Sequence, residues 1–373
     1  MSGIFSIRPP AFGLDISDLS IKIVDISIHT PLLSLRRDTA YARVGVTGET
    51  RMEQGIVEKG EIKNQEKLRD SIYQAVSSVS SQLSGKKHVV VSLPEEPAFV
   101  QVIQLPRMKE EEALRAVPFE AENYIPYPLD SVILDFEILP SSPDQDHLDV
   151  LLCAFPREIV NEYVEAIRGA GLVPIALEIE SLSCARALIK SGISSVPVMI
   201  IDLGEVRTGI AVFSDSSLRF TTSIQISGKQ FTEAIMNSLH IEQREAEALK
   251  CQHGLVSKEG GQALDVSRAL IPFVSDLAKQ ARRYMDFYES HEEHRHVSLK
   301  KETRVQKIYL CGGGTNLKGI VPFLTKELNI EVKRGNPWAN VDFPPNHLPP
   351  LSLPDALRYT TAIGLALRGS IYD

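Results

Sequence analysis

Residues 12–26, FGLDISDLSIKIVDI, decide the fold, because residues 199–213, MIIDLGEVRTGIAVF, repeat their pattern. In both stretches an apolar strand ends near an aspartate, Asp15 or Asp202, and a short turn leads into a second strand. Two copies of one supersecondary unit in a single chain indicate duplicated lobes that face a common cleft.

A hairpin with an aspartate at its head is suited to binding phosphate. Its turn can direct backbone N–H groups at phosphate oxygens, and its carboxylate can hold Mg²⁺ through water. The second turn has a glycine, Gly204, where such turns usually carry one, whereas the first has Ser17 followed by Asp18. An ordinary β-turn explains either hairpin taken alone.

A glycine-rich loop supplies a third element. In YLCGGGTNLKGI, residues 309–320, three glycines stand between an expected strand and an expected helix. Glycine lets the backbone approach a ligand closely, and a helix N-terminus favours negative charge. A tight strand-to-helix turn would use the same residues. The loop therefore indicates a binding site mainly because it follows the two hairpins in the sequence.

The composition limits the function classes. The chain has 373 residues, enough for two or three packed domains, and its net charge of −8 argues against general nucleic-acid binding. The four cysteines lie far apart in the sequence, which excludes the usual zinc-binding spacings and predicts reduced thiols. No apolar run reaches the roughly 20 residues that cross a bilayer, so we expect any membrane role to come through a partner.

The residues between the two hairpins predict an inserted unit. A helical pattern covers 65–83, and a buried strand follows at 88–93. From 96 to 172 the pattern indicates strand, helix, strand, strand and helix, which predicts a separate subdomain. The residue pattern of the second half predicts three strands within 198–226 and helices at 229–239, 243–252 and 267–290. It then predicts a strand, a glycine loop and a helix over 307–328, and a final helix at 353–369.

Two aspartate hairpins followed by a Gly-Gly-Gly-Thr loop resemble the superfamily of actin and the heat-shock ATPases. Residues 118–139, which contain YIPYPLD, and the NPWANVDFPP stretch at 336–345 are similar to the type IV pilus assembly protein PilM family, in the branch that includes FtsA. The resemblance implies an α/β, two-lobed actin-like ATPase fold with an inserted β-α-β-β-α subdomain in the first lobe. It also implies a first lobe over 1–195, a second over 196–355, and a C-terminal helix over 356–373 that returns to the first lobe.

The resemblance places ATP and Mg²⁺ in the cleft and assigns roles to residues. Glu180 matches an acid that positions the attacking water, and Asp15 and Asp202 match aspartates that hold Mg²⁺ through water. The positions that match the nucleotide-binding pattern are Asp15, Ser17, Ser20 and Lys22 in the first hairpin, Asp202, Gly204 and Thr208 in the second, Gly228 and Lys229 on the nucleoside side, and Gly312, Gly313, Gly314 and Thr315 in the adenosine loop.

The resemblance further implies a cytoplasmic scaffold of type IV pilus or related secretion machinery, peripheral to the inner membrane through a partner. The expected partner is the N-terminal cytoplasmic tail of a bitopic inner-membrane pilus assembly protein, and its expected contacts are Tyr124, Ile125 and Tyr127. The alternatives are a self-associating, filament-forming or membrane-recruited division protein like FtsA, a non-hydrolysing degenerate scaffold, and a sugar kinase. The kinase would need a catalytic-aspartate motif that the first lobe does not show. Neither nucleic acid nor direct membrane insertion is expected.

The first turn departs from the family pattern. An extra carboxylate beside a triphosphate costs Coulomb energy unless a cation compensates it, so Asp18 is expected to weaken ATP binding and to leave at most a weak ATPase. On that expectation, the double change of Ser17→Gly with Asp18→Ser strengthens ATP affinity. Glu205 adds an acid in the other hairpin. Arg207 could offset that charge, but it is expected to be a solvated strand residue.

Overall fold

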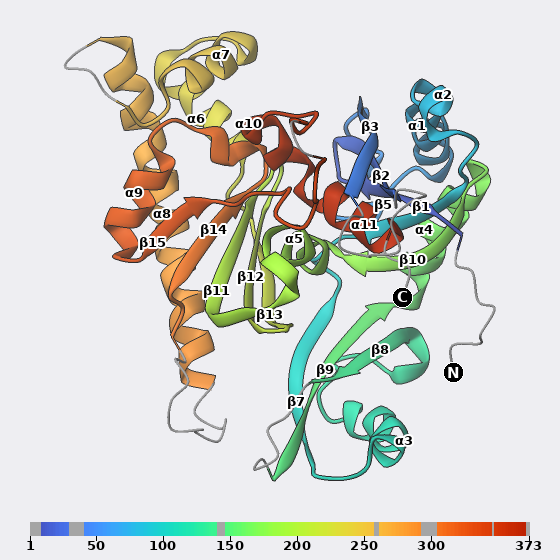
Figure 1. Cartoon of the computed structure of the whole chain (residues 1–373). Coiled ribbons are helices and arrows are strands. Elements are labelled where there is room, and N and C mark those ends of the chain that lie inside the picture. The colour runs from blue at the N-terminus through green and yellow to red at the C-terminus, as the bar shows by residue number, and fades with distance from the viewer. Residues whose placement is uncertain are drawn as a thin grey trace.

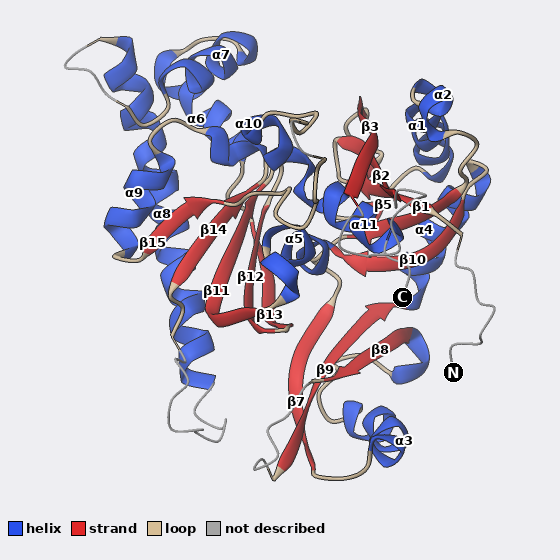
Figure 2. Cartoon of the chain, in the orientation of Figure 1, coloured by secondary structure: helices blue, strands red, loops and turns tan. Residues whose placement is uncertain are grey.

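Two lobes, each built on a five-stranded sheet, make up most of the molecule (Figures 1 and 2). The computed structural model describes residues 9–29, 41–139, 146–256, 261–291, 304–344 and 347–370. The first sheet contains β1 (Ala11–Ile16), β2 (Ser20–His29), β3 (Tyr41–Arg51), β6 (His88–Leu93) and β10 (Val173–Ile179). The second contains β11 (Ser194–Leu203), β12 (Thr208–Asp215), β13 (Ser217–Ile224), β14 (Lys307–Cys311) and β15 (Glu331–Arg334).

The two sheets share one topology, so the duplication predicted from the hairpins is confirmed. The first sheet has the order β10-β6-β1-β2-β3, and the second has the corresponding order β15-β14-β11-β12-β13. In each sheet the first strand of the hairpin pairs antiparallel with the next strand and parallel with a later one. Asp15 and Asp202 are each the penultimate residue of that first strand, so they occupy equivalent positions.

The inserted subdomain lies below the first lobe in Figure 1 and has its own small core. It consists of β7 (Phe99–Pro106), α3 (Glu110–Ala121), β8 (Val132–Ile138) and β9 (His147–Pro156), with an antiparallel sheet in the order β7-β9-β8. The following helix, α4 (Arg157–Gly169), completes the predicted element order but packs against α1 (Gln65–Ser78) and buries Tyr163 in the core of the first lobe.

The remaining helices surround the two sheets. They are α2 (Ser80–Leu83), α5 (Glu180–Leu188), α6 (Gly228–Leu239), α7 (Gln243–His253), α8 (Gln262–His291), α9 (Ile320–Leu328), α10 (Leu353–Ala356) and α11 (Thr360–Ser370). The single helix expected over 65–83 is wrong, because Val79, with φ −120° and ψ 9°, separates α1 from α2. Within the described ranges, no helix is both long enough and apolar enough to cross a bilayer.

The C-terminal helix α11 packs against β1 and α5 of the first lobe. Its close approach depends on glycine. A Cβ atom at Gly364 would lie 1.9 Å from the carbonyl oxygen of Ser183 in α5, and a Cβ atom at Gly13 would lie 2.4 Å from the carbonyl oxygen of Ala362. The last helix therefore stabilises the strand that presents Asp15.

Candidate functional site

The first hairpin gathers four of the predicted site residues into one hydrogen-bonded group. Asp15 is buried, and its Oδ1 accepts a hydrogen bond from Ser92 Oγ at 2.9 Å. Its Oδ2 lies 3.5 Å from Lys22 Nζ, which also donates to Ser20 Oγ at 3.1 Å. Ser17 Oγ lies 3.0 Å from Ser20 Oγ. The hairpin thus presents a carboxylate, a cation and two hydroxyls together.

The second hairpin brings Asp202 to the same region. Burial and the charge of Asp15 raise the pKa of Asp202 to about 6. The glycine loop passes directly beside it, since a Cβ atom at Gly312, which has φ +82°, would lie 2.3 Å from Asp202 Oδ1. The two equivalent aspartates and the glycine loop therefore converge, as the sequence pattern predicts.

Two of the predicted nucleotide-binding residues, Thr208 and Thr315, hold backbone turns in place. Thr208 is fully buried and its hydroxyl donates to the carbonyl oxygen of Ile226 at 2.6 Å. Thr315 is also fully buried, and its hydroxyl donates to the carbonyl oxygen of Gly312 at 2.7 Å within the 3₁₀ turn η5 (Gly313–Asn316). Each of these two hydroxyls closes a backbone turn, and their contact with a nucleotide stays a prediction.

The start of α6 docks on the turn of the second hairpin. The backbone N–H of Gly228 donates to the carbonyl oxygen of Gly204 at 3.0 Å, and that of Lys229 donates to the carbonyl oxygen of Glu205 at 2.9 Å. Gly204 itself donates its N–H to the carbonyl oxygen of Arg207 at 3.0 Å. These three predicted site residues thus fix the turn geometry through their backbone.

Arg207 is buried, so the expectation of a solvated strand residue is wrong. Its side chain is 12% exposed, and its guanidinium group lies 3.3 Å from Asp18, 3.2 Å from Glu96 and 3.1 Å from Glu180. Burial opposes the charge, but the three carboxylates raise the pKa of Arg207 overall. Because Arg207 belongs to the second lobe and its acidic partners precede that lobe in the chain, this cluster joins the two lobes.

Asp18 is compensated, which removes the expected electrostatic penalty. Its Oδ2 accepts a hydrogen bond from the N–H of Lys59 at 3.0 Å, and its Oδ1 accepts one from Gly60 at 3.2 Å, in addition to the Arg207 pair. A carboxylate with two backbone donors and a guanidinium is well stabilised. The Ser17→Gly, Asp18→Ser double change would remove these bonds, so it is no longer expected to strengthen ATP binding.

Glu180, the predicted water-positioning acid, begins α5 beside this cluster. Burial raises its pKa to about 8, with Asp15, Glu95 and Asp202 adding to the rise and Arg207 opposing it. Glu95 is buried and accepts hydrogen bonds from the N–H and hydroxyl of Ser181, at 3.2 and 2.8 Å, and from Thr221 of the second lobe.

Sequence reasoning missed Glu95 and Glu96, and it treated Arg207 as a solvated residue. The sequence does indicate the two acids as site candidates, because they stand together between Pro94 and Pro97 directly after a buried strand. A small cavity of about 20 Å³, near the space of one water molecule, is lined by Glu95, Glu180, Asp202 and their neighbours.

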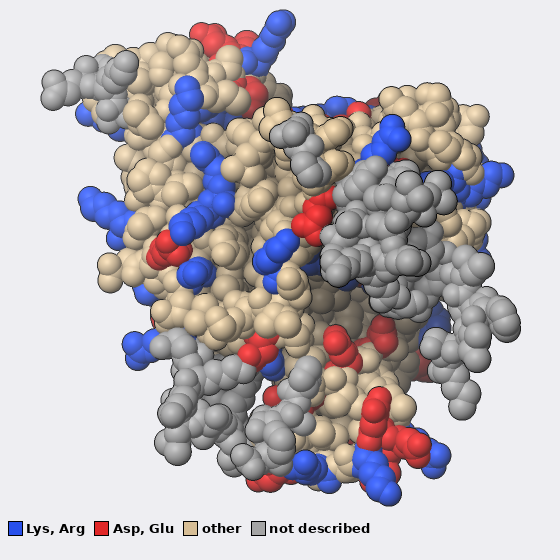
Figure 3. All heavy atoms as spheres, in the orientation of Figure 1, with Lys and Arg blue, Asp and Glu red and all other residues tan. Residues whose placement is uncertain are grey.

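The predicted partner surface lies on the inserted subdomain. Tyr124 and Tyr127 are 39% and 43% exposed, but Ile125 is only 6% exposed and packs in the subdomain core. Ile125 therefore supports this surface from beneath, and its contact with a partner stays a prediction. An open hollow of about 530 Å³ adjoins Tyr127 and is lined by Glu122, Tyr127, Pro128, Leu129 and Asp130. Acidic side chains also gather over α3 in Figure 3.

Two lobes of one topology, each presenting an aspartate hairpin, define an actin-like fold. The chain belongs to the family of the type IV pilus assembly protein PilM, which it matches over residues 13–370. The solved PilM-PilN type IV pilus biogenesis complex contains a chain similar to 98% of this one, with 100% of that chain covered, 26% identity and a TM-score of 0.77. The ethanolamine utilization protein EutJ from Carboxydothermus hydrogenoformans shares the fold at 15% identity and a TM-score of 0.55, over 97% of this chain and 90% of its own.

Cell division proteins FtsA match about half of this chain. The protein from Enterococcus hirae is 28% identical over 191 residues, which cover 49% of this chain and 43% of that protein. The protein from Pseudomonas aeruginosa is 24% identical over 220 residues, or 55% of this chain and 50% of that protein. The chain thus spans about half the length of the curated relatives it matches. The family and the branch expected from the sequence are confirmed.

Proposed function

We propose that this chain is a cytoplasmic nucleotide-binding scaffold of type IV pilus machinery, with ATP and Mg²⁺ between its lobes. The proposal rests on the proximity of Asp15 and Asp202, which occupy equivalent positions in two lobes of the same topology. A loop of three glycines lies beside Asp202. A ligand held by both hairpins would couple its binding to the relative position of the lobes.

The donor set fits a magnesium nucleotide. Mg²⁺ prefers carboxylate oxygens and keeps several waters, and a cation near Asp15 and Asp202 would relieve the repulsion that contributes to the raised pKa of Asp202. Lys22 would add positive charge for phosphate oxygens, beside the hydroxyls of Ser17 and Ser20. When bound, the nucleotide supplies the negative phosphates that these groups attract.

Slow turnover follows from the state of Glu180. With its pKa raised to about 8, the carboxyl group of Glu180 is in part protonated near neutral pH, and the protonated form is a poor acceptor for an attacking water. Arg207 also occupies one of its oxygens at 3.1 Å. These contacts favour a scaffold that binds nucleotide and hydrolyses it slowly, if at all.

Titration with a fluorescent ATP analogue, with and without Mg²⁺, tests the nucleotide site. We expect saturable binding that Mg²⁺ strengthens, and a loss of at least about tenfold in Asp202→Asn, which corresponds to about 1.4 kcal/mol. Asp215→Asn, at the far end of the neighbouring strand β12, is the matched control and should bind as the wild type does. Binding that is absent from the wild type, or equal in both variants, would contradict the proposal.

We further propose that the hollow beside Tyr127 binds the N-terminal cytoplasmic tail of a bitopic inner-membrane protein of the PilN type. Its lining combines apolar Tyr127, Pro128 and Leu129 with acidic Glu122 and Asp130. Cytoplasmic segments next to a membrane span are rich in lysine and arginine, so such a tail complements both the apolar surface and the charge. The neighbouring β8 is an edge strand of its sheet, which suits an extended peptide.

A labelled peptide of that tail provides the test, by fluorescence anisotropy against the full chain. We expect Tyr127→Ala to weaken binding at least about tenfold with little change in melting temperature, because the side chain is 43% exposed. Tyr73→Ala, at a tyrosine of α1 that is 62% exposed, is the control and should bind normally. If Tyr127→Ala loses binding only in proportion to lost stability, the tyrosine merely supports the subdomain and this assignment fails.

A further inference from the structure

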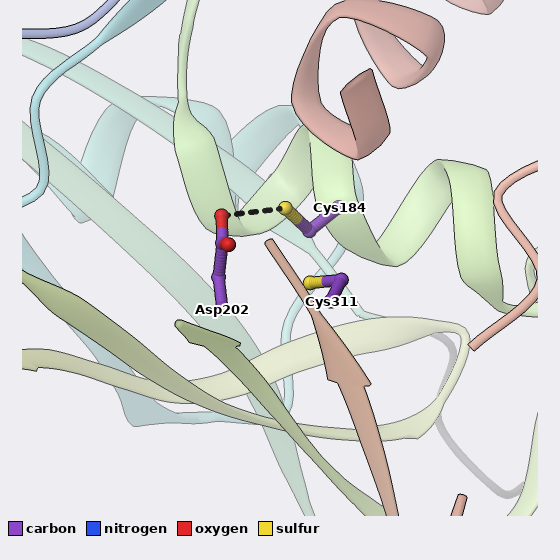
Figure 4. A group of neighbouring side chains, drawn as sticks. All are labelled: Cys184, Asp202 and Cys311. Atoms are coloured by element: carbon purple, nitrogen blue, oxygen red, sulfur yellow. Dashed lines mark hydrogen bonds between the residues drawn. The ribbon is translucent and has the colours of Figure 1, made fainter. Parts of the chain in front are cut away.

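Three side chains that commonly bind metals meet where the two lobes join (Figure 4). Cys184 comes from α5, whereas Asp202 and Cys311 come from the ends of β11 and β14. Their ligand atoms all lie within 4.8 Å of one another, and Cys184 Sγ is 3.6 Å from Asp202 Oδ2. Both cysteines are free and buried.

The topology explains why two of the three are neighbours. Asp202 and Cys311 are Cα partners on adjacent parallel strands. In the first lobe the equivalent strand β6 presents Ser92, whose hydroxyl donates to Asp15. The second lobe therefore has a thiol where the first has a hydroxyl, and α5 adds a second thiol from the opposite side. Sulfur ligands select soft or borderline cations, whereas Mg²⁺ prefers oxygen.

The spacing suits tetrahedral coordination. Zinc binds thiolate sulfur at about 2.3 Å and carboxylate oxygen at about 2.0 Å, which puts sulfur and oxygen about 3.5 Å apart across a tetrahedral angle. The 3.6 Å between Cys184 Sγ and Asp202 Oδ2 is close to that value. Thr361 Oγ1 lies 3.4 Å from Cys184 Sγ, so a second layer of polar atoms is present to orient the thiolate.

We propose that Cys184, Asp202 and Cys311 bind a thiophilic divalent cation of the Zn²⁺ class, with water as the fourth ligand. The small cavity lined by Cys184 and Asp202 has a volume of about 20 Å³, which suits one water. On binding, the two thiols release their protons to solvent and both sulfurs donate electron pairs to the metal, whose oxidation state does not change. The metal ties α5 to β11 and β14, and so holds the lobes in the arrangement seen here.

Cobalt titration of the reduced full chain tests the site, because tetrahedral Co²⁺ bound to thiolates has intense visible and near-ultraviolet absorption bands. We expect one Co²⁺ per chain with those bands, and full displacement by Zn²⁺. Cys184→Ser and Cys311→Ser should each weaken Co²⁺ binding at least about tenfold. Cys251→Ser, at an exposed thiol in α7, is the matched control and should bind Co²⁺ as the wild type does.

Circular dichroism of each variant separates loss of the site from loss of the fold, and a Cys311→Ala variant gives a second substitution at that position. Weak, octahedral-type Co²⁺ spectra, or bands that survive in both cysteine variants, overturn the proposal. Wild-type protein that binds no Co²⁺ when reduced, but loses two thiols on mild oxidation, would instead indicate a disulfide between Cys184 and Cys311. Asp202 belongs to both proposed sites, so the nucleotide titration above is made without transition metals. The cysteine variants, which keep Asp202, allow either proposal to fail alone.

Discussion

Asp18 and Glu180 both contact Arg207, yet their surroundings give them different roles. Asp18 has two backbone N–H donors in addition to the guanidinium, so its charge is compensated within the fold. Among the hydrogen bonds of the described residues, Glu180 has only the one from Arg207, and burial raises its pKa to about 8. The two acids therefore differ in the number of their hydrogen-bond donors, which no sequence pattern shows.

The raised pKa of Glu180 makes the stability of the protein depend on pH. The folded pKa of about 8 exceeds the ordinary value of 4.5, so the native state binds the proton more tightly than the unfolded chain does. The free energy of unfolding should therefore fall as pH rises from about 4.5 to about 8. Glu180→Gln cannot ionise and keeps an oxygen for Arg207, so we expect its stability to fall less over this range, by a difference of a few kcal/mol.

Urea unfolding at pH 5 and pH 8 measures this difference. Glu245→Gln, at an exposed glutamate of α7, is the control and should follow the wild type at both pH values. A wild type whose stability changes with pH no more than that of Glu180→Gln would show that Glu180 ionises normally in the folded protein.

At the scale of elements, the sequence predicted the helices and strands whose positions depend on a local residue pattern. The strands of the two hairpins and the helix pattern of α8 were located correctly, whereas the helix expected over 65–83 is divided at Val79. The short strands β4 (Val57–Glu58) and β5 (Glu61–Ile62) were missed because two residues carry no periodicity. Yet the turn between them supplies both backbone donors to Asp18, so a missed element changed the interpretation of the site.

The cysteines show the same limit. Their wide spacing in the sequence excluded the usual zinc motifs, but the parallel pairing of β11 with β14 places Cys311 beside Asp202, and α5 brings Cys184 to both. Metal-ligand spacing in a sequence detects only sites built from local segments. A site assembled by sheet topology needs the register, which the sequence did not provide.

The contact between α11 and α5 offers a test of the packing that supports the first hairpin. Gly364→Ala would place Cβ 1.9 Å from the carbonyl oxygen of Ser183, so one helix must move. We expect a loss of about 1–3 kcal/mol, typical of overpacking. Gly209→Ala is the matched control, because its Cβ would meet only Asp202 Cβ at the ordinary distance of 3.8 Å.

Urea unfolding of the two variants provides the measurement. Gly209→Ala should lie within about 0.5 kcal/mol of the wild type. Equal stabilities for the two variants would show that α11 adjusts its position without cost, and the close approach would then not explain why glycine stands there.

At the scale of the whole molecule, the cleft depends on residues that only the assembled fold brings together. Asp18 and Arg207 lie 189 residues apart, and Glu95 meets Thr221 across 126 residues. The sequence repeat correctly predicted that two hairpins face each other. It could not predict that a guanidinium group from the second hairpin would reach three carboxylates of the first lobe and its insertion.

Two arginine pairs connect the second hairpin to the first lobe, and they differ in burial. Arg207 is 12% exposed and has three carboxylate partners, whereas Arg51 and Glu205 form a pair with exposed fractions of 60% and 47%. Breaking a buried ion pair costs about 3–5 kcal/mol because a charge is left uncompensated, but an exposed pair contributes about 0–1 kcal/mol. The cost of losing Arg207 is raised further by its partner Glu96, because Glu96 Oε2 is buried and has no hydrogen-bond partner in the described structure.

Arg207→Gln and Arg51→Gln therefore form a matched pair of variants that test what holds the lobes together. Glutamine keeps hydrogen-bond donors and removes the charge, so we expect Arg207→Gln to lose about 3 kcal/mol or more of unfolding free energy, and Arg51→Gln to lose less than about 1 kcal/mol. Hydrogen exchange should quicken in Arg207→Gln at the turn after Asp202 and at the segment around Glu96, which the guanidinium group joins. Similar stability and exchange in the two variants would mean that packing, and not the buried cation, keeps the cleft closed.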